Sequence, residues 1–178
     1  MSIASFAVSR LPLMGVLSAV LLTAACATQG TNATSVAALP ALNEPPARNG
    51  EYRWFFDRED DEVQLFYGLA QSDDIPLGLT CAKGSGQIRV STPSEDNSRR
   101  QISLTSGGQV THLPARAEAA EVFDGYDIIA RTTPSDPVMQ AFGVNGWLAL
   151  AGKDGWIGLV GDSSSRNSAA QFMTGCKH

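Results

Sequence analysis

From Tyr52 to Val160 the chain repeats one pattern: short runs in which every second residue is apolar, separated by turn-forming residues. Successive side chains of a strand point to opposite faces, so each run gives a strand one face suited to a core. The runs are joined by charged or Gly-rich turns, such as 58–62 and 152–155, which is typical of hairpins. The pattern predicts a mainly β fold, an antiparallel sandwich or a small barrel.

The predicted elements follow from these apolar runs and from the turn-forming residues between them. Strands are expected at 52–56, 63–69, 77–81, 88–90, 102–104, 110–113, 126–132, 147–151 and 156–160, with Pro114 ending the sixth and a polar loop at 92–100. Near the C-terminus, Ser135-Asp136-Pro137 predicts the start of a short helix over 138–144. A second helix is expected over 164–174, with Gly175 at its exit.

A weak repeat accompanies the pattern. Ser72-Asp73-x-Ile75 is similar to Ser135-Asp136-x-Val138, and each is followed by a glycine and an apolar strand. Either a duplicated half-domain or chance similarity at turn positions explains it.

Composition limits the classes of partner. The 178 residues suffice for one ordinary domain, and the net charge is −5 with only three lysines. Nucleic-acid binding requires clustered Lys and Arg, so no nucleic acid is expected as a partner. A basic membrane-binding patch is equally unsupported, so any membrane attachment must come from another feature.

That feature is the amino terminus. Arg10 precedes an uncharged, mostly apolar run over 11–25, which is the layout of an export signal and is short for a membrane span. The segment Leu21-Leu22-Thr23-Ala24-Ala25-Cys26 resembles the lipobox of bacterial lipoproteins, although Thr23 departs from the commoner Leu. The resemblance implies that residues 1–25 are cleaved off and that Cys26 is acylated, which anchors the protein to a membrane. Ala27, rather than Asp, then implies the periplasmic face of the outer membrane.

Two alternatives to the lipobox remain open. One is an ordinary cleaved signal with Cys26 incidental, and the other is an uncleaved anchor helix. The lipobox is favoured because a lone exposed thiol beside a polar segment is an unusual feature to export. Residues 26–50 are small, polar and rich in proline, so we expect a lipidated Cys26 and a flexible tether over 26–50, followed by a single β domain over 51–178.

Cys81 and Cys176 lie outside the lipobox. In an oxidising compartment two remaining cysteines favour a disulfide, and two independent buried thiols are the alternative. No Cys-x-x-Cys is present and histidine is rare, so neither a metal nor a cofactor is expected.

Other candidate residues carry weak signals. Trp54, Trp147 and Trp156 could line a groove for a sugar or peptide, although tryptophans in a β domain also serve as packing residues. The acidic run from Asp57 to Glu62 lacks the spacing of a calcium loop and reads as a solvated turn. His112 has no Gly-x-Ser-x-Gly elbow to accompany it and reads as a sheet-edge residue.

Two functional classes follow. The absence of a catalytic signature favours a non-catalytic envelope protein that binds another envelope protein, a wall component or an assembling complex. The alternative is a hydrolase of envelope polymers that uses a carboxylate pair such as Asp127 and Asp136.

Overall fold

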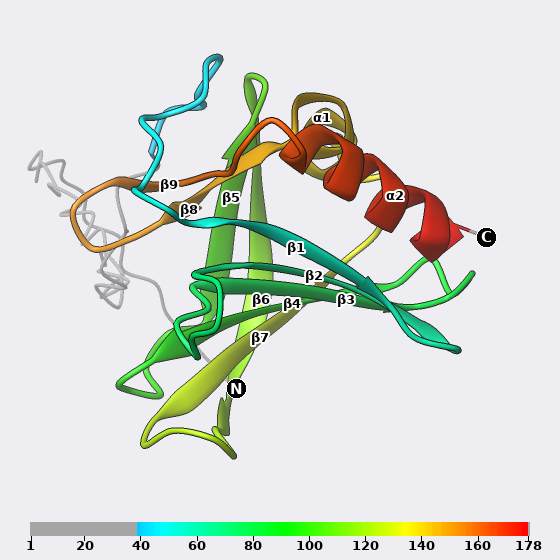
Figure 1. Cartoon of the computed structure of the whole chain (residues 1–178). Helices are drawn as coiled ribbons and strands as arrows, with labels where there is room; N and C mark the ends of the chain where they lie inside the picture. The colour runs from blue at the N-terminus through cyan, green and yellow to red at the C-terminus, as the bar shows by residue number, and fades with distance from the viewer. Residues whose placement is uncertain (1–38, 178) are drawn as a thin grey trace, which may run out of the picture. The chain divides into compact units, whose positions relative to one another are not determined.

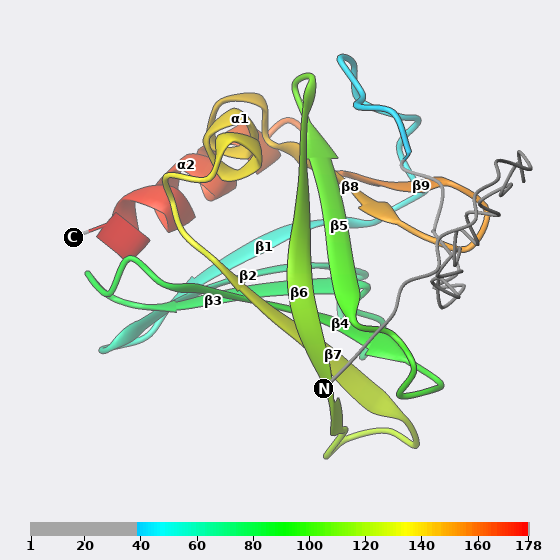
Figure 2. The same cartoon turned by 180° about the vertical axis from the view of Figure 1, so that it is seen from behind.

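A computed structural model describes residues 39–177, which contain nine antiparallel strands and two helices (Figures 1 and 2). The strands are β1 (Arg53–Arg58), β2 (Glu62–Gly68), β3 (Leu77–Ala82), β4 (Ile88–Ser94), β5 (Gln101–Ser106), β6 (Gln109–Ala119), β7 (Tyr126–Thr132), β8 (Trp147–Ala151) and β9 (Trp156–Val160). They form one sheet in the order β1-β2-β3-β4-β7-β6-β5-β8-β9. The helices are α1 (Pro137–Asn145) and α2 (Ser165–Lys177). Neither helix is long and apolar enough to cross a membrane.

The two ends of this sheet approach each other and nearly close a barrel. The indole N–H of Trp54 in β1 donates to the carbonyl of Leu159 in β9 at 3.2 Å, and the Tyr67 hydroxyl donates to the carbonyl of Val160 at 3.2 Å. These side-chain bonds join the β1–β2 hairpin to β9 across the gap in the sheet. The prediction of a mainly β fold with short helices near the C-terminus is confirmed, with a barrel-like sheet as the outcome.

Closure depends on β6, which is long enough to pair with a different strand at each end. Residues 109–114 pair with β5, and residues 115–119 pair with β7. The prediction that Pro114 ends this strand is wrong. Proline has no N–H to donate to a neighbouring strand. The strand tolerates Pro114 because β6 leaves β5 at this residue, and the N–H of the next residue, Ala115, donates to Arg100 O at 2.8 Å.

The interior of the sheet is packed with apolar side chains. The alternation in β2 places Val63, Leu65 and Tyr67 inward with at most 1% exposure, as the sequence predicts. Phe142 of α1 and Phe172 of α2 are fully buried in the same core. The helices therefore complete the core that the strands begin.

Helix α1 has the ends that its sequence predicts. The Asp136 carboxylate accepts from the N–H of Val138 at 2.8 Å, and Gly146 ends the helix with a φ of 75°. Helix α2 differs from the prediction, because it continues through Gly175 to Lys177. Gly175 is a packing position: a Cβ there would lie 2.7 Å from Cγ1 of Val63.

The structure corrects one further prediction in the loops and distinguishes the two Ser-Asp segments. The expected loop at 92–100 is shorter, since β4 continues to Ser94 and pairs with β7 throughout. The two Ser-Asp segments have different local structures. Asp136 caps a helix, whereas the Ser72 hydroxyl accepts from the N–H of Asp74 within the turn between β2 and β3.

Candidate functional site

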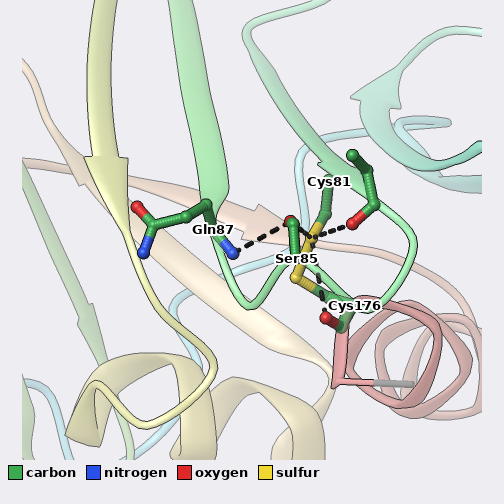
Figure 3. Close-up of a disulfide and its surroundings, with 5 residues drawn as sticks. Cys81, Ser85, Gln87 and Cys176 are labelled. Carbon is green, nitrogen blue, oxygen red and sulfur yellow. Dashed lines mark hydrogen bonds between the residues drawn. A yellow bond between two sulfur atoms is a disulfide. The ribbon is translucent and has the colours of Figure 1, made fainter.

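The predicted lipidation site, Cys26, lies outside the described residues, so lipidation stays a prediction. The other two cysteines lie within them and are bonded to each other. Cys81 at the end of β3 and Cys176 near the end of α2 form a disulfide with a Cα–Cα distance of 5.5 Å (Figure 3). The bond joins the C-terminal helix to the sheet, and both cysteines are buried.

The Gly-rich turn beside this disulfide has a structural role. The N–H of Gly84 donates to Gly175 O at 3.3 Å, and the N–H of Gly86 donates to Cys176 O at 3.0 Å. Both glycines have positive φ, which orients their N–H groups toward the end of α2. The turn therefore satisfies carbonyls that the end of a helix leaves unpaired.

The three predicted binding tryptophans fall into two groups. Trp54 faces the interior, is 3% exposed, and packs against the rings of Tyr67 and Phe142. Its place is the core, and it is not available to a ligand. Trp147 and Trp156 both face outward from β8 and β9, at opposite ends of these two strands, but Trp147 is only 6% exposed and Trp156 is half-buried.

The outward face of β8 and β9 is covered by the chain's own residues 39–48, which we call the strap. The Trp156 indole N–H donates to the carbonyl of Pro40 at 2.7 Å. The N–H of Leu42 donates to the Thr105 hydroxyl at 3.1 Å, and the N–H of Gly108 donates to the carbonyl of Leu42 at 2.8 Å. In Figure 1 the strap rises beside the β5–β6 turn and returns past β9 into β1.

Small residues make room for the strap. Ala149 in β8 is completely buried although it faces outward. Opposite it is Gly158 in β9, where a Cβ would lie 2.7 Å from Cγ of Pro46 and 3.0 Å from the carbonyl oxygen of Ala47. The sequence reasoning missed the strap. The outward small residues beside two outward tryptophans are the signal that could have indicated it.

A shallow hollow lies where the strap, β8, β9 and α2 meet. Its volume is about 270 Å³, and its lining residues are Pro45, Asn145, Gly146, Trp147, Val160, Gly161, Asp162, Ser163, Ser165 and Arg166. Hydrogen bonds from the Ser164 hydroxyl and N–H lower the pKa of the Asp162 carboxyl. The hollow therefore combines one carboxylate with the guanidinium of Arg166, and a second carboxylate for acid–base work is not among its residues.

The proposed carboxylate pair is not brought together. Asp127 lies near the start of β7, and Asp136 follows the end of that strand, so the strand alone separates them by roughly 17 Å at 3.3 Å per residue. A glycosidase pair requires about 5–9.5 Å. The Asp136 carboxylate is also occupied, since it caps α1 and accepts from the Thr111 hydroxyl at 3.0 Å.

His112 has a serine neighbour that no sequence motif predicts. Its Nδ1 lies 2.9 Å from the Ser103 hydroxyl and 3.3 Å from Nε2 of Gln101. Ser103 and His112 are a direct cross-strand pair of β5 and β6, and His112 is exposed. Neither bonded partner of the ring is a carboxylate that could orient it as a general base.

Within residues 39–177, no three His, Cys, Asp or Glu side chains are grouped so that they could hold a metal ion. No protein-family model, curated protein or solved structure matches this chain.

Proposed function

We propose that this chain is a membrane-anchored lipoprotein of the cell envelope with a non-catalytic role in binding, structure or assembly. The observation that carries the proposal is the filled interior of the barrel-like sheet. Inward side chains from the strands and both helices form one core cluster. A small barrel filled in this way holds no chamber for a ligand, so recognition must use the outer surface.

The hollows of that surface also favour a binding role over catalysis. The hollow beside Arg166 and a second one of about 490 Å³ beside Tyr126 are both shallow. Small-molecule sites are typically enclosed clefts of about 300–1,000 Å³ with convergent polar groups. A broad contact with another envelope protein or a wall component suits such a surface better than a small substrate does.

The lipobox-like segment supports the anchor. Acylation at Cys26 would supply two or three acyl chains, and two are enough for stable attachment, whereas one is not. The periplasmic face of the outer membrane is the location that Ala27 favours. The strap then connects this anchor to the barrel.

The anchor is tested by labelled palmitate incorporation and membrane fractionation of Cys26→Ser beside the unaltered chain. We expect the variant to lose both the label and its membrane attachment. Ala27→Asp is the matched control, because it should keep the label and move the protein to the inner membrane. Equal labelling of Cys26→Ser and the unaltered chain would refute the proposal.

The binding role is tested by crosslinking in intact envelopes. A specific partner should be captured by the anchored chain and lost when an exposed residue of the hollow at the start of α2, such as Arg166, is changed. Turnover of wall polymers by the purified full chain, abolished by one carboxylate substitution, would contradict the non-catalytic role.

A further inference from the structure

The strap fixes the place at which the chain enters the barrel. The first described residue is Leu39, and the carbonyl of Pro40 accepts the indole N–H of Trp156 beside the β8–β9 turn. Only residues 27–38 lie between Cys26 and Leu39. An anchor at Cys26 would therefore pull on the barrel at the β8–β9 hairpin.

We infer that the turn between β8 and β9 is the part of the barrel that contacts the lipid bilayer. The inference rests on the lipid anchor of the proposed function and adds an orientation to it. Three independent features of the hairpin support it: the length of the connecting chain, the exposed apolar surface and the distribution of charge.

The length of chain limits how the barrel can lie. Thirteen residue steps join Cys26 to Leu39, and even a fully extended chain of that length spans at most ~45 Å. A domain of this size has a radius of gyration of roughly 14 Å, so it is about 35–40 Å across. If the opposite end of the barrel faced the bilayer, the connecting chain would have to be almost fully extended, which costs conformational entropy. The hairpin end is reached without that cost.

The hairpin has an apolar tip of the kind that enters a lipid interface. Ile157 is 47% exposed and packs over Gly152 at the turn. The preceding residue, Trp156, is half-buried on the other face of the hairpin, and tryptophan favours the level of the lipid headgroups. Two cations border the tip: Lys153 is exposed, and the Arg99 guanidinium donates to the carbonyl of Ala151 at 2.7 Å. The turn itself carries one cation, Lys153, and one carboxylate, Asp154, so it has no net charge.

Charge disfavours the competing surfaces. The loop between β6 and β7 exposes Val122 and Phe123, but Glu121 and Asp124 flank this pair directly. The acidic turn 57–62 between β1 and β2 lies at the opposite end of the barrel from the β8–β9 hairpin, as both views show (Figures 1 and 2). Anionic headgroups would repel both of these acidic segments, whereas the hairpin turn, without net charge, would not be repelled.

The test uses the full lipidated chain in vesicles of phosphatidylethanolamine and phosphatidylglycerol. With Cys26 acylated and Cys81 bonded to Cys176, the substitution Ile157→Cys introduces a single free thiol for an environment-sensitive fluorophore. Matched controls carry the same label after Val122→Cys and after Glu59→Cys. Lys153→Cys is a second probe of the hairpin, to be used if Ile157→Cys lowers the cooperativity of melting.

We expect a blue shift of the hairpin label on vesicles and its quenching by brominated acyl chains, with no change for the labels at 59 and 122. A response at 59 or 122 as large as that of the hairpin label would overturn the orientation. So would an unchanged hairpin label on protein that floats with the vesicles. Protein that does not float would instead show that the anchor itself is wrong, and the orientation would fall with it.

Discussion

Removal of the Cys81–Cys176 disulfide should be the most destabilising change that leaves the packing of the sheet intact. The bond joins residues 95 positions apart. In the chain-entropy model, closing a loop of this length lowers the entropy of the unfolded chain by an amount worth about 4.7 kcal/mol at 25 °C. Engineered bridges often deliver less than this model predicts, so we expect a loss of about 2–4.5 kcal/mol.

Alanine is the better replacement, because both cysteines are buried and a serine hydroxyl would lack a partner there. The assay is urea unfolding of Cys81→Ala, Cys176→Ala and the double variant, followed by circular dichroism. Either single substitution already breaks the bond. The double variant should therefore lose at most about 1 kcal/mol more than the worse single one, far from additive.

The slope of the urea transition provides a second readout. A cross-linked unfolded chain is more compact and exposes less surface, so the variants should unfold with a steeper dependence on urea. A stability loss below about 1 kcal/mol, or purely additive single effects, would refute the reasoning. A loss this small would mean that the Gly-rich turn 83–86 and the packing of α2 hold this helix without the bond. Additive effects would mean that the two cysteines contribute independently of each other.

Three further predictions concern local contacts. Asp136→Ala should lower the free energy of unfolding by about 1–2 kcal/mol because α1 loses its cap, whereas Asp136→Asn, which can still cap, should cost less; equal losses in urea melts would contradict the capping role. Gly158→Ala should destabilise the chain by about 1–3 kcal/mol, because the new methyl group meets Pro46. In a chain that begins at Glu51 the same substitution should be neutral or stabilising, and the same sign in both chains would contradict the strap contact. The chain 51–178 should still melt cooperatively, but with a free energy of unfolding about 1–3 kcal/mol below that of 39–178, since three hydrogen bonds of the strap are lost. A helix-dominated spectrum or a non-cooperative melt of 51–178 would contradict an independent β domain.

The parts of the fold that could be predicted are those with a local cause. Strands β7, β8 and β9 have the bounds expected from the sequence, because each run of apolar residues is closed by turn residues at both ends. The ends of α1 were equally readable, since Asp136 and Gly146 act on their immediate neighbours. The disulfide could be predicted from the residue types alone, because Cys81 and Cys176 are the two cysteines outside the lipobox-like segment.

The parts that could not be predicted depend on distant neighbours. Whether Pro114 ends a strand depends on which partner lies beside it, and β6 changes partner at that residue. Whether Gly175 ends a helix depends on Val63, which lies more than a hundred residues away. The strap forms its hydrogen bonds mainly through backbone groups, and it packs against small residues of β8 and β9. Such contacts require no periodic pattern of side chains in 39–48, so the sequence shows none.

Taken with the proposed orientation, the structure limits where a protein partner could bind. Strand addition at the edge of a sheet requires free backbone groups. At the gap between β1 and β9, the carbonyls of Leu159 and Val160 already accept bonds from Trp54 and Tyr67. The outward face of β8 and β9 is covered by the strap, and the hairpin tip would be directed at lipid. Strands β8 and β9 run from that tip to the helices, so the α1–α2 end, with the hollow beside Arg166, would face away from the bilayer. A partner in the periplasm would then meet this end first, and substitutions there should impair partner capture while leaving the anchor intact.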